Sequence, residues 1–120
     1  MFVRMLPRAD RERSADEILG DLRRRATAIA GADYVLHQAA IPSVPRQVKD
    51  PVTSNRANVD ATLNVLVAAR DAGVRRFVFA GSSSAYGNTL TSPKHEALPT
   101  SPLSPYALQK LVAEQYCQLF

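Results

Sequence analysis

Two short apolar runs, separated by a segment of helical length, constrain the fold of this chain more than any other feature. The runs cover residues 34–39 and 76–81. The helical segment between them opens with Asp50-Pro51, an N-cap followed by a first-turn proline, and closes at Gly73. A helix between two strands is the usual crossover between parallel strands. The sequence therefore predicts two buried parallel strands joined by a helix.

A second helix is predicted after the second run. Ser104-Pro105 again supplies an N-cap and a first-turn proline, and apolar residues recur at helical spacing to Phe120. The polar, proline-containing segment 42–51 bounds the first strand, and residues 87–103 are a predicted loop. The order strand, helix, strand, loop, helix is typical of the α/β class. The predicted apolar side of the last helix carries Leu108, Leu111, Val112 and Leu119.

Candidate functional residues gather at the carboxyl ends of the two predicted strands, where open α/β sheets bind ligands. Residues 37–40 end the first strand and residues 82–84 end the second. Tyr106 and Lys110 lie four residues apart at the start of the last helix, so their side chains share one helix face. A nearby ammonium and a helix N-terminus both stabilise a phenolate. The pair is therefore predicted to transfer protons.

Several motifs resemble those of one known family in order and spacing. They are Tyr34-Val35-Leu36-His37-Gln38-Ala39-Ala40, Ser43-Val44-Pro45-Arg46, Asp50-Pro51, Asn58-Val59-Asp60, Gly81-Ser82-Ser83-Ser84-Ala85-Tyr86-Gly87 and Leu103-Ser104-Pro105-Tyr106-Ala107. The chain is similar to the extended short-chain dehydrogenase/reductase superfamily, in its NAD-dependent nucleotide-sugar epimerase/dehydratase branch. Within that branch it most resembles the bacterial UDP-N-acetylglucosamine and UDP-hexose 4-epimerases. The resemblance covers residues 20–120, and residues 1–19 are expected to form a poorly defined N-terminal arm.

The resemblance implies a partial Rossmann-like, doubly wound parallel sheet with NAD as cofactor. The family's Gly-x-x-Gly-x-x-Gly loop does not occur in the sequence, whose five glycines have other spacings. Residues 20–120 are therefore expected to be a fragment of the NAD(P)-binding domain, without the first βαβ unit and without the substrate domain. Poor affinity for NAD is expected, because that loop leads into the helix N-terminus that would bind the pyrophosphate.

The resemblance also implies Tyr106, Lys110 and Ser82 as catalytic residues. Tyr106 would take the proton of the sugar 4-hydroxyl, Lys110 would stabilise the phenolate and hold the nicotinamide ribose, and Ser82 would relay the proton. Contacts to a UDP-sugar substrate are implied for Ser43, Ser82, Ser84 and Tyr106. The expected reaction is UDP-hexose 4-epimerisation by transient oxidation at C4, with UDP-N-acetylglucosamine or UDP-glucose as substrate.

Cofactor contacts are implied along much of the chain. Asp21 and Leu22 would contact the adenine, and the small side chains at 39 and 40 would let the phosphate-ribose part pass. Asn58 would brace that turn, although a surface asparagine on a helix needs no function. His37 is interpreted as a satisfied core histidine rather than a ligand. The implied cofactor-binding residues are Asp21, Leu22, Gln38, Ala39, Ala40, Asn58, Ser82, Tyr106 and Lys110.

Composition argues against several other classes of protein. The net charge is +4, and the arginines near the N-terminus are interleaved with acidic residues, which favours a solvated helix face over a nucleic-acid-binding patch. No apolar run approaches the roughly 20 residues of a membrane span. Two histidines and one cysteine, Cys117, offer no metal-ligand spacing. A single cysteine, interpreted as a buried inert thiol, and no recognisable signal peptide together favour the cytoplasm.

Two alternatives to the epimerase remain open. One is a dehydratase or decarboxylase of the same family. Dehydration is disfavoured because Ser83-Ser84 stand where the dehydratases typically carry Asp-Glu. The other alternative is an inactive fragment that serves only as an interaction module.

Self-association is the last expectation from the sequence. A homodimer is predicted through the helices at 51–72 and 104–120, which correspond to the pair that forms the family's dimer interface. These helices offer more apolar surface than two short strands can cover. Their apolar residues are Leu63, Leu66, Leu108, Leu111, Val112 and Leu119.

Overall fold

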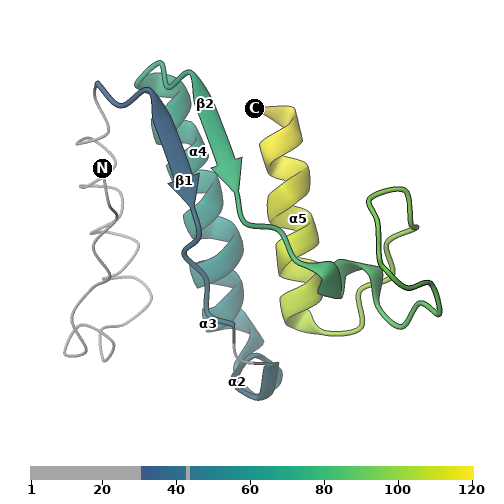
Figure 1. The fold of residues 1–120 in the computed structure, drawn as a ribbon. Helices are drawn as coiled ribbons and strands as arrows, with labels where there is room; N and C mark the ends of the chain where they lie inside the picture. The colour runs from purple at the N-terminus through teal and green to yellow at the C-terminus, as the bar shows by residue number, and fades with distance from the viewer. Residues whose placement is uncertain (1–30, 43) are drawn as a thin grey trace.

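A computed structural model of the chain describes residues 31–42 and 44–120, and it contains a two-stranded parallel sheet. Strands β1 (Tyr34–His37) and β2 (Arg76–Phe79) pair with Tyr34 opposite Arg76 and His37 opposite Phe79. Figure 1 shows the two strands side by side with α4 behind them and α5 beyond β2. The predicted α/β arrangement of parallel strands and a helical crossover is confirmed.

The crossover consists of several helical pieces in series. They are α2 (Val44–Lys49), α3 (Pro51–Asn55), the π-helical turn η3 (Arg56–Asp60) and α4 (Ala61–Asp71). Asp50 caps α3 as predicted, because its Oδ1 accepts a 3.1 Å hydrogen bond from the Thr53 N–H. Hydrogen bonds from Thr53 hold the pKa of the Asp50 carboxyl below its usual value. Gly73 follows the C-cap of α4 with φ of 68°, a left-handed conformation that favours glycine.

Helix α2 has no counterpart among the elements predicted from the sequence, which assigns no helix within the polar, proline-containing segment before Asp50. Pro45 is the second residue of α2, where the missing N–H has no intrahelical partner to lose.

A short 3-10 turn and a long loop connect β2 to the last helix. The turn η4 (Ser83–Tyr86) is followed by residues 87–103, a loop as predicted, and by α5 (Pro105–Leu119). Ser104 caps α5, because its Oγ accepts a 3.1 Å hydrogen bond from the Ala107 N–H. Within the loop, Lys94 donates a 2.8 Å hydrogen bond to the carbonyl of Gly87, the residue that follows η4.

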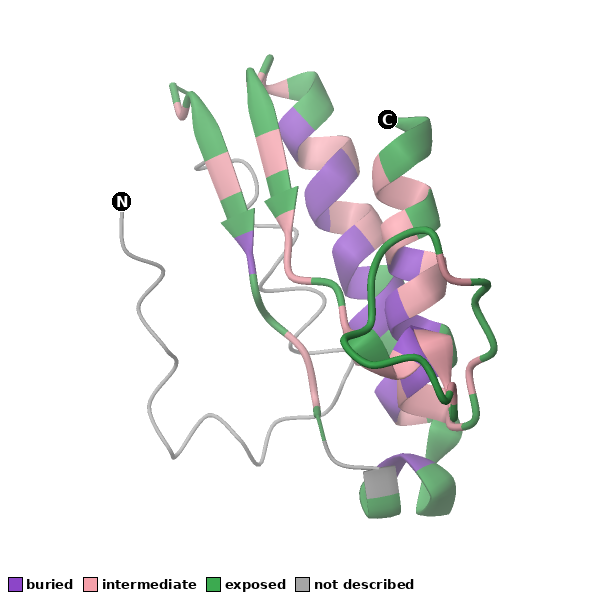
Figure 2. Ribbon diagram, turned by 45° about the vertical axis from the view of Figure 1, so that its right-hand side comes forward, coloured by how far each residue is buried: buried purple, intermediate pink, exposed green. Residues whose placement is uncertain are grey.

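Only one face of the sheet is covered by the described helices, as the burial colours in Figure 2 show. Tyr34 and Leu36 are each 60% exposed, and Val78 opposite Leu36 is 46% exposed. Side chains alternate along a strand, and His37 on the other face contacts α4 through Thr62. The prediction that both strands are buried was therefore correct for one face of the sheet and wrong for the other.

Helix α5 packs with the face opposite to the one predicted. Its buried residues are Ala107, Gln109, Lys110 and Ala113, whereas Leu108 is 52% and Leu119 is 81% exposed. The interior position of a glutamine and a lysine reflects hydrogen-bond partners that a hydrophobic pattern does not reveal. On α4, Leu66 was predicted to add to the exposed apolar surface and is instead buried.

Candidate functional site

Asn58 holds the turn that follows β1 through hydrogen bonds to the backbone of Ile41. Oδ1 of Asn58 accepts a 2.7 Å hydrogen bond from the Ile41 N–H, and Nδ2 donates a 3.3 Å hydrogen bond to the Ile41 carbonyl. Gln38 and Ala39 are exposed and Ala40 is half-buried, so the turn presents one glutamine and two small side chains to its surroundings. Asn58 therefore braces the turn as predicted, and its interpretation as a surface residue was wrong.

His37 is a buried residue of the core with a satisfied ring nitrogen. Thr62 donates its one hydroxyl proton to the Asn58 carbonyl at 2.6 Å, so Nε2 of His37 donates the 2.9 Å hydrogen bond to Thr62 Oγ1. The ring also lies 5.8 Å from Phe77 and 6.0 Å from Phe79. Burial, assisted by the positive charge of Lys110, lowers the pKa of His37 to about 4. The interpretation as a satisfied core histidine is confirmed.

Lys110 reaches from α5 to the carboxyl end of β2. Its Nζ donates a 2.7 Å hydrogen bond to the carbonyl of Ala80 and lies 4.6 Å from the centre of the Phe79 ring. The residue is only 5% exposed, and this burial lowers the pKa of its ammonium. A lysine held in this way has a fixed position beside the strand end that carries Ser82.

Ser82 and Ser84 form a hydrogen-bonded pair at the end of β2. Their Oγ atoms are 2.7 Å apart, and the Ser84 N–H donates a 3.3 Å hydrogen bond to Ser82 Oγ. Ser82 is the N-cap of η4 with extended backbone, which directs its side chain back over the turn. Both residues are half-buried. The predicted serine positions are thus adjacent in space as well as in sequence.

Tyr106 lies half-buried in the first turn of α5, one turn before Lys110. Among residues 31–42 and 44–120, no hydrogen bond joins its phenol to Ser82 or to Lys110. Catalytic hydrogen bonds are often long in ligand-free enzymes and tighten only around the substrate. Three other residues named in the sequence analysis, Asp21, Leu22 and Ser43, lie outside the residues that the structure describes.

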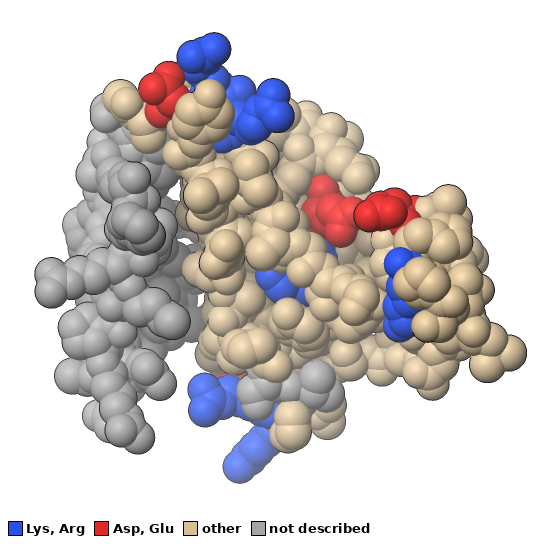
Figure 3. All heavy atoms as spheres, in the orientation of Figure 1, with Lys and Arg blue, Asp and Glu red and all other residues tan. Residues whose placement is uncertain are grey.

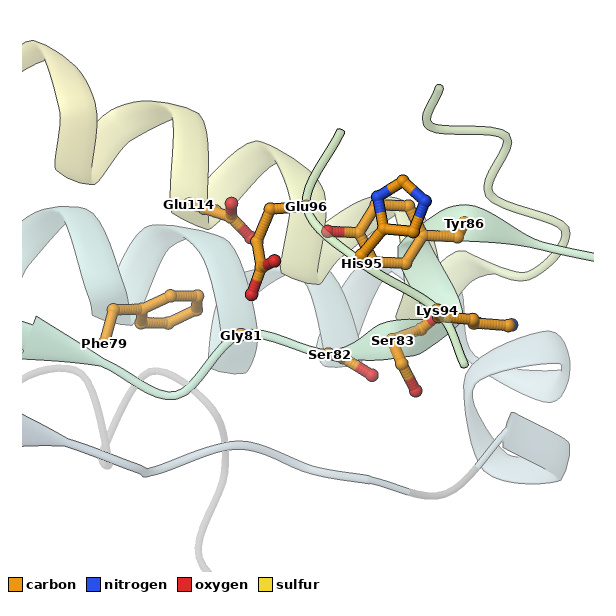
Figure 4. Close-up of a pocket in the computed structure, with 9 residues that line it drawn as sticks. All are labelled: Phe79, Gly81, Ser82, Ser83, Tyr86, Lys94, His95, Glu96 and Glu114. Atoms are coloured by element: carbon orange, nitrogen blue, oxygen red, sulfur yellow. The ribbon is translucent and has the colours of Figure 1, made fainter. Parts of the chain in front are cut away.

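A pocket of about 450 Å³ opens beside the serine turn (Figure 4). In Figure 4 the carboxylates of Glu96 and Glu114 approach each other over Gly81. A Cβ added at Gly81 would lie 3.2 Å from Oε2 of Glu114, so this carboxylate lies against the strand end. The pocket is lined by Phe79, Gly81, Ser82, Ser83, Tyr86, Lys94, His95, Glu96 and Glu114.

Neither glutamate was proposed from the sequence, although a signal was present for one of them. Glu114 follows Lys110 by four residues and so lies on the same helix face. Glu96 comes from the irregular loop 87–103, where residue spacing carries no information about which side chains face the site.

The described residues contain no group of three or more histidine, cysteine or acidic side chains placed to hold a metal ion. None of the helices that the structure describes has the length and apolar character needed to cross a membrane. On the face drawn in Figure 3, basic side chains lie at the upper and lower ends, near the centre and at the right, and acidic atoms lie among them at the upper end and right of the centre. This face therefore carries no continuous basic surface.

Parallel strands with a helical crossover, and with a serine pair and a buried lysine at the carboxyl end of β2, define a Rossmann-like segment. The sequence profile of the NAD dependent epimerase/dehydratase family matches residues 7–120. The chain belongs to this family, which uses NAD.

Known proteins similar to the chain include enzymes of both chemistries in the family name. A UDP-glucose 4-epimerase of Mycolicibacterium smegmatis is 39% identical over 73% of this chain and 28% of that protein. A UDP-N-acetylglucosamine 4-epimerase of Methanobrevibacter ruminantium M1, solved with UDP-N-acetylmuramic acid, is 36% identical with a TM-score of 0.76, over 83% of this chain and 31% of that one. A dTDP-glucose 4,6-dehydratase of Streptomyces venezuelae, solved with NAD, is 32% identical with a TM-score of 0.72, over 82% and 30%. The chain thus spans about a third of the length of these proteins.

Proposed function

We propose that this chain carries the proton-transfer part of an NAD-dependent UDP-hexose 4-epimerase. One observation carries the proposal. The helix that carries Tyr106 in its first turn delivers Lys110 to the carboxyl end of β2, beside the hydrogen-bonded pair of Ser82 and Ser84. An ammonium and a hydroxyl at one strand end, with a phenol one helical turn from the ammonium, are the groups needed to move a proton on and off a sugar hydroxyl.

Each of the three residues has a role in this chemistry. Tyr106, as phenolate, accepts the proton of the sugar 4-hydroxyl and returns it after the configuration at C4 has changed. Lys110 stabilises the phenolate and holds the nicotinamide ribose. Ser82 hydrogen-bonds both the sugar oxygen and Tyr106 and relays the proton between them. When bound, NAD supplies the acceptor and donor of the C4 hydride.

The described residues fit one half of the NAD molecule. The exposed turn with Ala39 and Ala40, braced by Asn58, leaves room for a ribose to approach the backbone at the end of β1. Ser82, Tyr106 and Lys110 would hold the nicotinamide ribose at the end of the neighbouring strand. For the adenine, Asp21 and Leu22 remain the proposed contacts, and Gln38 is proposed to contact the phosphate-ribose part. The sequence contributes no Gly-x-x-Gly-x-x-Gly cradle for the pyrophosphate.

The sugar is proposed to bind over the serine pair, with Ser43, Ser82, Ser84 and Tyr106 as its contacts. The carboxylates of Glu96 and Glu114 in the adjoining pocket would repel a diphosphate, so this pocket suits the hydroxyl-bearing part of the substrate. Dehydration remains the less favoured chemistry. Ser83 and Ser84 supply no carboxylic acid at the two positions after Ser82.

Turnover by the chain itself tests the proposal. The chain is incubated with NAD⁺ and UDP-galactose, and formation of UDP-glucose is followed by proton NMR. Tyr106→Phe should lower the rate at least about a hundredfold, since general acid–base groups contribute that much or more. Tyr116→Phe, on the same helix and half-buried, is the matched control and should retain the rate. Equal turnover in Tyr106→Phe and wild type would refute the assignment.

Binding measurements separate the epimerase from the second candidate function. Isothermal titration with NAD⁺ and with UDP-glucose should give measurable, if weak, binding of at least one of them. Failure of both to bind would favour the interaction module, for which the lack of the glycine motif is the supporting observation.

We also propose a homodimer and a cytoplasmic location. On α5, the exposed Leu108 and Leu119 and the half-buried Val112 follow one helical stripe. A second copy that presents the same stripe across a two-fold axis would bury it. The single Cys117, half-buried and with its thiol pKa raised by burial, is suited to a reducing compartment.

A further inference from the structure

A buried glutamine lies between the tyrosine and the lysine of the candidate site. Gln109 is 4% exposed on the inner side of α5. Its Oε1 accepts a 2.7 Å hydrogen bond from Asn58 Nδ2, and its Nε2 donates a 3.3 Å hydrogen bond to Ser54 Oγ. Ser54 is 2% exposed, and its hydroxyl points to the carbonyls of Asp50 and Pro51, at 3.1 and 3.0 Å. The amide of Gln109 is thus hydrogen-bonded at both its oxygen and its nitrogen.

The same asparagine holds the turn at the end of β1. Asn58 bonds both the N–H and the carbonyl of Ile41, and Nε2 of the fully buried Gln47 also donates to that carbonyl. A continuous path of hydrogen bonds therefore runs from the turn, through Asn58 and Gln109, to the helix that carries Tyr106 and Lys110. Any shift of the turn relative to α5 would break hydrogen bonds of buried amide groups, and a buried amide without partners destabilises the fold. The path therefore allows only one position of the turn relative to the helix.

The local geometry around Asn58 supports a functional role for this path. Asn58 lies in the π-helical turn η3, and turns of this kind inside helices occur frequently at functional sites. Its carbonyl accepts the Thr62 hydroxyl at 2.6 Å, and Thr62 in turn accepts the hydrogen bond of His37. Asn58 is thus connected to the end of β1, to the following turn and to α5 at once.

We propose that Gln109 is a positioning residue. By fixing Asn58 it sets the turn at 38–41 relative to Tyr106 and Lys110, and so aligns the two segments between which the cofactor ribose would lie. This inference rests on the proposed function, because it assigns the cofactor to that turn. Gln109 itself touches neither substrate nor cofactor.

A first experiment measures turnover in Gln109→Met, which preserves the shape of the side chain and removes both hydrogen bonds. The kcat should fall by about 10- to 100-fold, because small misplacements of reacting groups have effects of this size. The KM for UDP-galactose should stay within about twofold, because no substrate contact is lost. Gln118→Met, at an exposed position of α5, should match wild type in both constants. A kcat within twofold of wild type, at a temperature where circular dichroism shows the variant folded, would overturn the proposal.

A second experiment follows amide hydrogen exchange and does not depend on turnover. The Ile41 amide should lose at least about tenfold of its protection in Gln109→Met and keep it in Gln118→Met. Unchanged protection in Gln109→Met would show that the turn is held without Gln109, which overturns the inference.

A third measurement on the wild-type chain covers the case in which Gln109→Met does not fold. Added NAD⁺ should shift the side-chain NH₂ signals of Asn58 and Gln109 together with the backbone signals of Ala39 and Ala40. Movement of the backbone signals alone would contradict the coupling. A wild-type chain that neither turns over nor responds to NAD⁺ would refute the proposed function. In that case the hydrogen exchange of the Ile41 amide would alone test whether Gln109 holds the turn at 38–41.

Discussion

The ammonium of Lys110 donates its 2.7 Å hydrogen bond to the carbonyl of Ala80, which is the first residue after β2. This bond fixes the face of α5 that carries Lys110 to the sheet. Within the part of the chain that the structure describes, no carboxylate pairs with this ammonium. The charge is balanced by a carbonyl dipole and by the face of Phe79. A charge buried in this way is maintained at the expense of stability.

Replacement of this lysine should therefore separate stability from activity. Lys110→Met keeps most of the side-chain volume and removes the buried charge whose pKa burial lowers. The thermal midpoint at pH 7 should equal or exceed that of wild type, while turnover falls at least about a hundredfold. Differential scanning calorimetry and the UDP-galactose assay measure the two effects. A large drop in the midpoint would mean that the bond to Ala80 outweighs the cost of burial.

His37 should make the folded state sensitive to mild acid. Its pKa falls from 6.5 in the unfolded chain to about 4 in the folded one, so the unfolded state binds more protons between these values. The contribution to stability is complete above about pH 6.5 and is lost as the pH falls toward 4. The loss amounts to about 3 kcal/mol. Urea unfolding at a series of pH values should show this decline.

Histidine variants isolate that contribution from the titration of the carboxylates. Between pH 6.5 and 4, the free energy of unfolding of His37→Gln should decline by about 3 kcal/mol less than that of wild type. In His95→Gln, where the replaced histidine is exposed, the wild-type pH dependence should persist. Identical pH profiles for His37→Gln and wild type would contradict the burial of a neutral imidazole.

Gly87 should tolerate substitution far less than Gly73, although both have positive φ. At Gly87 (φ 59°, ψ −142°) an added Cβ would lie 2.2 Å from the Ser101 carbonyl oxygen, whereas at Gly73 it would meet nothing within 4 Å. Gly73→Ala should cost about 1 kcal/mol, the ordinary penalty of a left-handed conformation. Gly87→Ala should cost about 2–3 kcal/mol or more and loosen the loop over the serine turn. Chemical denaturation of the two variants gives the comparison, and equal costs would count against the close approach of Ser101.

The proposed dimer should depend on the exposed stripe of α5. At micromolar concentration, sedimentation velocity should show a dimer for wild type and a shift to monomer for Leu108→Glu, which places a charge in the interface. Leu90→Glu changes a fully exposed leucine on the loop and should leave the association state unaltered. A wild-type chain that sediments as a monomer would refute the dimer.

Local signals in the sequence predicted the ends of the elements better than the burial of their faces. Asp50, Gly73 and Ser104 act through bonds or dihedral angles within a few residues, and each has the predicted role. The inner face of α5 could not be predicted in this way. Its choice depends on partners of Gln109 that are 51 and 55 residues away in the sequence.

The residues of the candidate site also differ in whether local sequence or tertiary structure brings them together. Tyr106 and Lys110 are brought to one face by helical spacing alone, and Ser82 and Ser84 are neighbours in one turn. The pocket glutamates and the path through Asn58 and Gln109 require the tertiary structure. A short apolar run also gives no sign of which of its two faces is covered, and this explains the error for Leu36 and Val78.

The π-helical turn at Arg56–Asp60 also limits how the length of the crossover can change. The turn closes its hydrogen bonds from i to i+5, so it holds one residue more than an α-helical turn. Deletion of one residue from this turn would yield a regular α-helix and would leave Pro51–Asn55 in nearly the same orientation relative to α4. The residues inside the turn would be spread differently around the axis, and Asn58 would lose the position from which it contacts both Ile41 and Gln109. The crossover can therefore shorten at this turn without rotating α3, but only with loss of the hydrogen bonds of Asn58.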